Sequence, residues 1–188
     1  PTAASPTASS AFAMTYDSVR DRVVLFSNTF GAAAGQTWEW DGSNWSLVST
    51  TGPAPRAATT MAFDTARGVT VMFGGQVVSM GMQNDHWEWD GTAWTQRTFA
   101  TMPAARTEAA MAYDPLRGVI VLQGGLELGS VSDELWEFDG TTWQLITTAS
   151  GPGTRYQHDM LFDDSVGKIV LRGAELTIGN DELWQWDG

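Results

Sequence analysis

The sequence predicts an all-β protein built from four similar units, and three observations carry that prediction. One pattern recurs four times along the 188 residues, with a period of about 49 residues. Each copy contains short apolar runs of strand length rather than helix length. Each copy also contains an Asp-Gly pair among aromatic residues, which is typical of a turn between two antiparallel strands.

The composition is that of a folded, acidic protein. The chain has 22 acidic and 10 basic side chains, a net charge of −12, no Cys and 43% hydrophobic residues. This apolar content is enough to form a core, and the absence of a Lys/Arg cluster argues against a nucleic-acid partner. No apolar run approaches the roughly 20 residues that cross a bilayer, so we expect no membrane insertion. The compartment stays open, with an extracellular or cell-surface location favoured.

The first strand of each copy alternates small and large residues, as the segment 59–64 illustrates. It carries a Met and ends at an Asp that opens a tight D-x-x-R-G turn, because an Asp side chain accepts backbone hydrogen bonds there. The second strand is a β-branched apolar run that ends in a small pair, Gly-Gly in copies two and three. The two first-strand columns are Met14, Met61, Met111, Met160 and Asp17, Asp64, Asp114, Asp163.

The third strand carries a W-x-W pair, and the fourth begins at a Trp after the Asp-Gly turn. All ten Trp residues belong to this landmark, and Phe138 takes one of its places in the third copy. Large rings at the same place in every copy supply buried area, so we interpret them as core rather than as sugar-stacking platforms. The first Trp of the pair recurs at steps of 49, 49 and 48 residues, at Trp38, Trp87, Trp136 and Trp184.

These landmarks together resemble the kelch repeat of β-propellers, in its variant with a D-x-x-R-G turn and a W-E-W-D-G-x-x-W hairpin. The resemblance covers nearly the whole chain. It implies a β-propeller of four kelch-like blades of four antiparallel strands, over approximately 6–50, 51–98, 99–148 and 149–188. The range 1–188 is then a single propeller domain or a propeller fragment. Copies one and four depart most from the pattern, at Ser9, Ser27-Asn28 and Gly173-Ala174.

The last copy ends at Gly188, before the place of its outer strand. The N-terminal segment aligns with an inter-blade linker and does not supply that strand. Three arrangements follow: a four-bladed ring with one three-stranded blade, a fragment of a larger propeller, and two chains that combine into a larger ring. We favour the last two, because an open strand edge invites pairing with another chain. A homo-oligomer through the open blade edge is the corresponding expectation.

The second-to-third strand loops differ between copies, whereas the turns at the other ends of the strands are nearly identical. Divergent loops on a repeated scaffold are where binding usually resides. We therefore expect these loops, at 28–36, 76–83, 126–132 and 175–179, to contact a protein or glycan partner. The alternative is that their apolar side chains only cover the blade ends. Those side chains are Phe30, Val78, Met80, Met82, Leu128, Val131 and Ile178.

An arginine begins the first strand of copies two to four, at Arg56, Arg106 and Arg155. Three guanidiniums around a channel mouth would suit an anionic ligand, because their forked donors match a carboxylate. The alternative is that each arginine pairs with an acidic neighbour such as Glu108, Glu134 or Asp181. The excess of acidic residues favours pairing.

No catalytic, metal or cofactor site is predicted. A copper radical oxidase with similar blades needs a Cys, which this chain lacks, and His86 and His158 occupy non-equivalent places. His86 is expected at a strand surface. Glu108 beside Arg106 is the best candidate carboxylate for glycoside hydrolysis.

The sequence therefore favours a non-enzymatic binding or assembly module that presents its linkers and second-to-third strand loops. One alternative is a carbohydrate-active or lyase-type enzyme with its site at the channel mouth. Another is a structural link in a surface or filament assembly through the open last blade.

Overall fold

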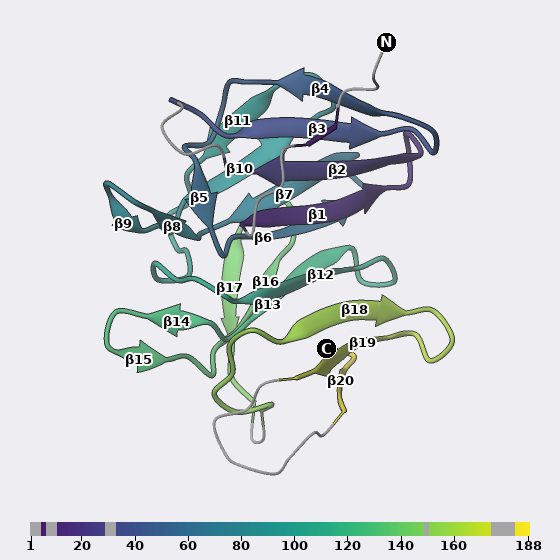
Figure 1. The fold of residues 1–188 in the computed structure, drawn as a ribbon. Coiled ribbons are helices and arrows are strands. Elements are labelled where there is room, and N and C mark those ends of the chain that lie inside the picture. The colour runs from purple at the N-terminus through teal and green to yellow at the C-terminus, as the bar shows by residue number, and fades with distance from the viewer. Residues whose placement is uncertain (1–4, 7–10, 29–32, 149–150, 174–182) are drawn as a thin grey trace.

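A computed structural model describes the protein at residues 5–6, 11–28, 33–148, 151–173 and 183–188. Every regular element in these ranges is a β-strand, and no bilayer-crossing helix is found in them (Figure 1). The expected all-β class is thereby confirmed.

Each repeat forms its own antiparallel sheet, with the strands in sequence order. Sheet 1 comprises β1 (Phe12–Asp17), β2 (Arg22–Ser27), β3 (Gln36–Trp40) and β4 (Trp45–Ser49). Sheet 2 comprises β6 (Thr60–Asp64), β7 (Val69–Phe73), β10 (His86–Trp89) and β11 (Trp94–Arg97). Sheet 3 comprises β12 (Ala110–Asp114), β13 (Val119–Gln123), β16 (Leu135–Phe138) and β17 (Trp143–Ile146). Sheet 4 has three strands, β18 (Asp159–Asp163), β19 (Lys168–Arg172) and β20 (Trp184–Trp186).

Two of the expected loops are β-hairpins. Strand β8 (Gln76–Val77) pairs with β9 (Gly81–Met82), and β14 (Leu126–Glu127) pairs with β15 (Ser130–Val131). The linker strand β5 (Arg56–Ala57) pairs with β8. The Gly-Gly pair turns the chain from sheet to hairpin, with φ of 65° at Gly74 and 93° at Gly75.

The four sheets pack face against face, with β1 beside β6, β6 beside β12 and β12 beside β18 (Figure 1). We call the face of each sheet that is turned to the preceding sheet its front face, and the face turned to the next sheet its back face. The same terms are used for the equivalent faces of sheets 1 and 4. Between sheets 1 and 2, for example, back-face Val24 and Phe26 meet front-face Met61, Met72 and Trp89. Equivalent apolar clusters join sheet 2 to sheet 3 and sheet 3 to sheet 4.

Several repeated landmarks have the roles that their residue types predict, whereas Trp40, Trp45, Trp87, Trp184 and Trp186 are only half-buried. Trp89, Trp94 and Trp143 are between 1% and 9% exposed, as core residues are. The Asp64 side chain accepts the backbone N–H groups of Ala66 and Arg67 and so closes its turn.

Candidate functional site

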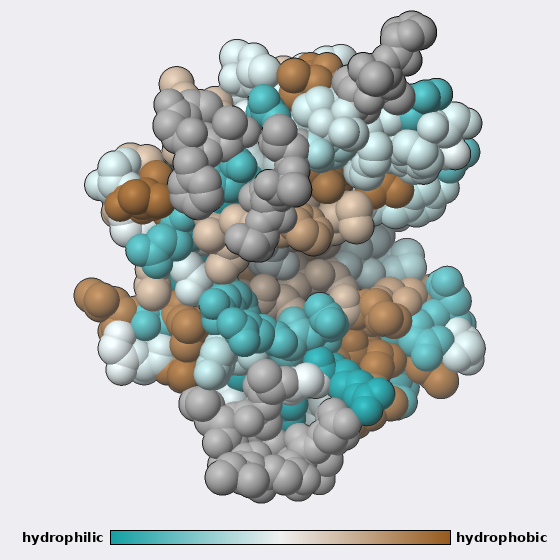
Figure 2. Space-filling model, viewed as in Figure 1, coloured by the Kyte–Doolittle hydropathy of each residue, from teal (hydrophilic) through white to brown (hydrophobic). Residues whose placement is uncertain are grey.

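The two hairpins emerge at the same end of the stacked sheets, which we call the hairpin end (Figure 1). Their tips are apolar and open: Val78 is 79% exposed, Met80 61% and Leu128 96%. Figure 2 shows hydrophobic residues at these tips. Met82 and Val131 are half-buried at the hairpin bases. The other two expected contact residues, Phe30 and Ile178, lie outside the described residues.

Arg106 holds the base of the β14–β15 hairpin. Its side chain is buried and donates to the carbonyl of Gly124 at 3.0 Å and to Glu134 Oε2 at 2.6 Å. It also lies 2.8 Å from Glu127 Oε1. Its own backbone accepts from the Gly75 N–H at 2.9 Å and donates to Gln83 O at 3.1 Å. Arg106 therefore joins the hairpin of sheet 2, through its backbone, to that of sheet 3, through its side chain.

Arg56 and Arg155 repeat this arrangement, and both are 2% exposed. Arg56 contacts both carboxylate oxygens of Asp85, at 2.5 and 2.8 Å, and donates to Gly74 O. Arg155 donates to Gly173 O at 2.8 Å. All three guanidiniums are thus buried against protein oxygens, and Arg56 and Arg106 pair with carboxylates, as the pairing alternative expects. The carboxylates that contact Arg106 are Glu127 and Glu134 rather than Glu108, and Asp181 is outside the described ranges.

The acidic partners of Arg56 and Arg106 each also accept a hydrogen bond from the Trp two residues later. Trp87 Nε1 donates to Asp85 at 2.7 Å, and Trp136 Nε1 donates to Glu134 at 2.8 Å. Burial alone would raise the pKa of Glu134, but the hydrogen bonds from Trp136 and Arg106 outweigh it and the pKa is lowered. Sequence reasoning missed this acidic column, although its constant place before the W-x-W pair was a signal.

The first copy supports the view that these charges act as pairs. It has Ser9 in the arginine column and Gln36 in the acidic column, so both charges are absent together. Gln36 still accepts from Trp38 Nε1, at 3.1 Å. The tryptophan contact is therefore kept where the ion pair is lost.

Glu108 lies on a strained linker beside this network. Its φ is 58°, and Ala58 and Gln157, also two residues after an arginine, have φ of 54° and 56°. Successive linkers are joined here, because Glu108 N donates to Ala58 O at 2.9 Å and Gln157 N donates to Glu108 O at 3.1 Å. Glu108 Oε2 is buried and has no hydrogen-bond partner in the described ranges. Left-handed non-glycine residues of this kind need a surrounding structure that holds them in place.

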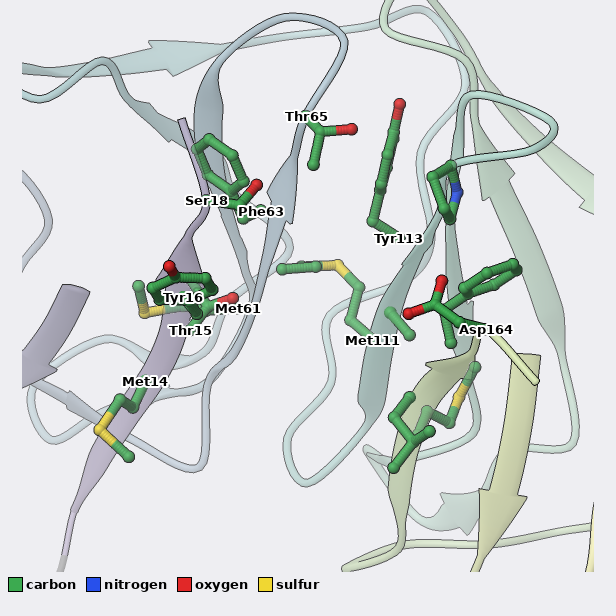
Figure 3. Close-up of a pocket in the computed structure, with 16 residues that line it drawn as sticks. Met14, Thr15, Tyr16, Ser18, Met61, Phe63, Thr65, Met111, Tyr113 and Asp164 are labelled. Carbon is green, nitrogen blue, oxygen red and sulfur yellow. The ribbon is translucent and has the colours of Figure 1, made fainter. Parts of the chain in front are cut away.

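The first strands of all four sheets line a cavity of ≈ 470 Å³ (Figure 3). The four residues of the Met column line it, with aromatic rings of the same strands such as Tyr113 and Phe63. Ser18, Thr65 and Asp164 lie among the lining residues from the first turns. A second cavity of ≈ 260 Å³ is lined in part by His158 and Asp159. The side chains that line the larger cavity carry mainly Met thioethers, aromatic rings and hydroxyl groups.

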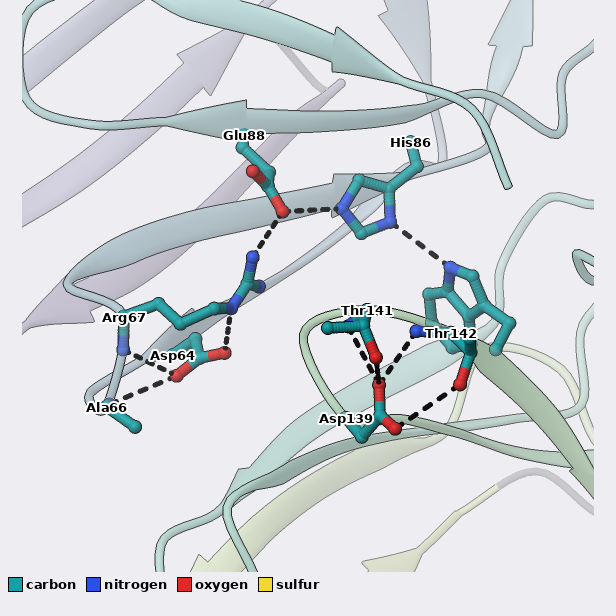
Figure 4. A network of polar contacts seen from close by, with 9 residues as sticks. Asp64, Ala66, Arg67, His86, Glu88, Asp139, Thr141 and Thr142 are labelled. Carbon is teal, nitrogen blue, oxygen red and sulfur yellow. Dashed lines mark hydrogen bonds and ion pairs between the residues drawn. The ribbon is translucent and has the colours of Figure 1, made fainter. Parts of the chain in front are cut away.

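A polar network joins sheets 2 and 3 (Figure 4). Its centre is His86, which is 0% exposed, so the expectation of a strand-surface histidine is wrong. The ring nitrogen Nε2 is 3.3 Å from Glu88 Oε1, and Nδ1 accepts from Trp143 Nε1 at 3.2 Å. Arg67 Nη1 also contacts Glu88 Oε1. Aromatic rings of sheet 3 bury His86. Because these rings are distant from His86 in the sequence, the residues next to His86 could not predict its burial.

The network shifts both titratable groups. Burial lowers the pKa of His86, and the hydrogen bond to Glu88 only partly opposes that shift. Burial would raise the pKa of Glu88, but the hydrogen bonds from His86 and Arg67 lower it to about 2. A neutral His86 and an ionised Glu88 are therefore the stable pair at neutral pH.

Comparison of the sequence with protein-family models and with curated proteins gives no match.

Proposed function

We propose that the chain is a kelch-type β-propeller unit that acts as a non-enzymatic binding module, with its hairpin end as the contact surface for a protein partner. The proposal of a propeller is supported by four successive antiparallel sheets that pack face to face with equivalent residues at each junction. It is further supported by the cavity that all four first strands line.

The exposed hairpin tips are the observation that carries the binding function. Val78, Met80 and Leu128 place large apolar side chains in solvent on two neighbouring hairpins. Large exposed apolar side chains that gather at one end of a protein favour an interaction site there. The buried Arg106 holds the hairpin bases from below through ion pairs and backbone bonds, so the tips are presented on a fixed base. A fixed surface loses little conformational entropy on binding.

The same arginines weigh against the channel-mouth enzyme. A site for an anionic substrate needs donors that are open to it, whereas the guanidiniums of Arg56, Arg106 and Arg155 are buried against protein oxygens. The strained Glu108 is the residue on which an enzyme would depend, and Glu108→Gln is its direct test.

The test is binding of the 188-residue chain to arrayed extracellular proteins and glycans, with two hairpin variants and one control. Met80→Asp and Leu128→Asp place charge on the tips, and Leu116→Asp does so at the opposite end of sheet 3, where Leu116 is 73% exposed. We expect a protein ligand whose binding falls at least tenfold in both hairpin variants and is unchanged in the control.

Two results would overturn the proposal. One is binding that Leu116→Asp weakens as much as the hairpin variants do. The other is turnover of a glycan that Glu108→Gln abolishes, which would establish the enzyme instead. Binding of a glycan without turnover, sensitive to Met80→Asp, would keep the hairpin end as the site and change the partner class.

A further inference from the structure

The front face of sheet 1 is apolar and more exposed along its first strand than the front faces of sheets 2 and 3, although Leu25 and Trp38 on the same face are 9% and 6% exposed. Met14 is 51% exposed, whereas its counterparts Met61 and Met111 are 7% and 6% exposed. Tyr16 is 52% exposed, whereas the equivalent Tyr113 is 9% exposed. The Trp40–Trp45 pair on this face is half-buried, with ring centroids 5.6 Å apart, although the equivalent pairs of sheets 2 and 3 are buried. This face has the residues of a junction without the neighbouring sheet.

The back face of sheet 4 is uncovered in the same way. Leu161 is 57% exposed, whereas the equivalent Ala62 and Ala112 are 4% and 6% exposed. Leu183 is also 57% exposed, in a column where Leu135 is 4% exposed. The two ends of the stack are therefore the two complementary halves of the junction that occurs three times inside it.

The chemistry of the internal junctions indicates what the fourth-sheet face can accept. At the first junction Trp89 Nε1 of the front face donates to Glu39 of the back face at 3.0 Å, and at the third Trp186 donates to Glu137 at 2.7 Å. Sheet 4 has Gln185 in this acidic column, and an amide oxygen can accept the same bond.

The arginine that accompanies the acid is also replaced in sheet 4. Arg20, Arg67 and Arg117 each form an ion pair with the acid of their own back face. The equivalent residue of sheet 4 is Val166, which is 47% exposed. Both charges of this pair are thus replaced together, so covering the face with a tryptophan-bearing front face strands neither partner of that ion pair. The charges that remain on the face include Asp159, which lies opposite Arg172, and Lys168, which is paired with Asp187 at 2.7 Å.

We propose that two copies of this chain associate through these faces, with the back face of sheet 4 of each copy on the front face of sheet 1 of the other. In this arrangement Leu161 of one copy contacts Met14 of the other copy, as Ala62 contacts Met111 inside the chain. Gln185 of the first copy accepts a hydrogen bond from Trp40 of the second. The contact is head-to-tail, and two such contacts related by a twofold axis close the assembly. This surface is distinct from the hairpin end and does not depend on the binding function proposed above.

The first test is the solution mass of the 188-residue chain by light scattering after size exclusion. We expect twice the 20.4 kDa chain mass at micromolar concentration. Met14→Lys and Leu161→Glu each bury one unpaired charge at both contacts, and each variant alone is expected at the single-chain mass. The matched control is Leu128→Glu, a fully open leucine at the hairpin end, and it is expected to keep the doubled mass.

Mixing the two variants tests the pairing of the faces. An equimolar mixture of Met14→Lys and Leu161→Glu has one unaltered contact and one that joins Lys to Glu, so the doubled mass is expected to return. A wild-type chain at the single-chain mass would overturn the proposal, as would a dimer that both variants leave intact. A mixture that stays at the single-chain mass would overturn the face-to-face assignment even if each variant alone dissociates. A wild-type mass greater than that of two copies, reduced in both variants, would overturn the closed pair. It would indicate an open head-to-tail polymer instead.

Discussion

Trp143 of sheet 3 donates its indole N–H to His86 Nδ1 of sheet 2, over 3.2 Å in the interior of the protein. Because Nδ1 accepts, the ring proton of neutral His86 lies on Nε2, which faces Glu88 Oε1 at 3.3 Å. At the preceding junction, between sheets 1 and 2, Trp94 Nε1 donates to Thr37 Oγ1 at 2.7 Å. Trp94 is the repeat equivalent of Trp143, and Thr37 is the repeat equivalent of His86. Each of these two junctions thus supplies one acceptor for a buried indole.

Replacing His86 by leucine, the residue of the same column in copies three and four, is expected to destabilise the protein. The indole N–H of Trp143 loses its acceptor, and an unsatisfied buried donor costs about 1–3 kcal/mol. In a double-mutant cycle with Trp143→Phe, the cost of His86→Leu should fall by about 1 kcal/mol, because no donor is left unsatisfied. Urea denaturation of the four proteins measures this coupling. Additive losses would mean that the contact across the junction contributes nothing.

A second cycle tests whether Arg106 and Glu134 act as a unit. Arg106→Ser leaves the partly exposed Glu134 in the hairpin base without its guanidinium and is expected to cost about 1–3 kcal/mol. Adding Glu134→Gln reproduces the Ser9 and Gln36 combination of the first copy, and the introduced amide can still accept from Trp136 as Gln36 does from Trp38. The double variant should therefore recover at least about 1 kcal/mol relative to Arg106→Ser alone, as coupled neighbours do. Equal stability of the double variant and Arg106→Ser would contradict a paired role.

The strands, turns and sheet order could be predicted from the sequence because each rests on local patterns repeated four times. The hairpins β8–β9 and β14–β15 could not, because two-residue strands contain no alternation to detect. The burial of His86 depends on Phe138 and Trp143, whose rings lie 4.8 and 5.9 Å from it and belong to the next sheet. The roles of Arg56 and Arg106 were open for a similar reason, since their partners lie 29 and 28 residues along the chain.

Stability is expected to rise with pH between about 4.5 and 6.5, and His158 should contribute much of that slope. Burial, together with the charge of Arg155, lowers the pKa of His158 to about 4, below the ordinary value of 6.5. The unfolded chain therefore binds a proton in this window that the folded chain does not, so the stabilisation present above pH 6.5 is lost as the pH falls to 4. The loss is about 2–3 kcal/mol.

The variant that checks this assignment is His158→Ala, since Ala109 is the equivalent residue of sheet 3. Urea midpoints at pH 4.5, 5.5 and 7 should show a smaller slope in the variant, even if its stability at pH 7 is lower. The pKa of Glu88 is about 2 in the folded chain against an ordinary 4.5, so Glu88 contributes only at the acid edge of this window. An unchanged slope in His158→Ala would assign the pH dependence to His86, whose pKa is also lowered by burial.

Two glycines between β13 and β16 separate the effect of backbone conformation from that of close approach. Gly124 and Gly129 have φ of +66° and +89°, so alanine at either position is strained by about 1–2 kcal/mol. A Cβ at Gly129 meets nothing within 4 Å, whereas a Cβ at Gly124 lies 2.5 Å from the carbonyl oxygen of Arg155. That oxygen accepts the Gly125 N–H at 2.7 Å and joins the linker of sheet 4 to sheet 3.

Gly124→Ala must therefore displace the linker, and its loss of unfolding free energy should exceed that of Gly129→Ala by at least about 1 kcal/mol. Hydrogen exchange of the Gly125 amide should quicken in Gly124→Ala alone, and equal losses with equal exchange would show that the linker yields without cost.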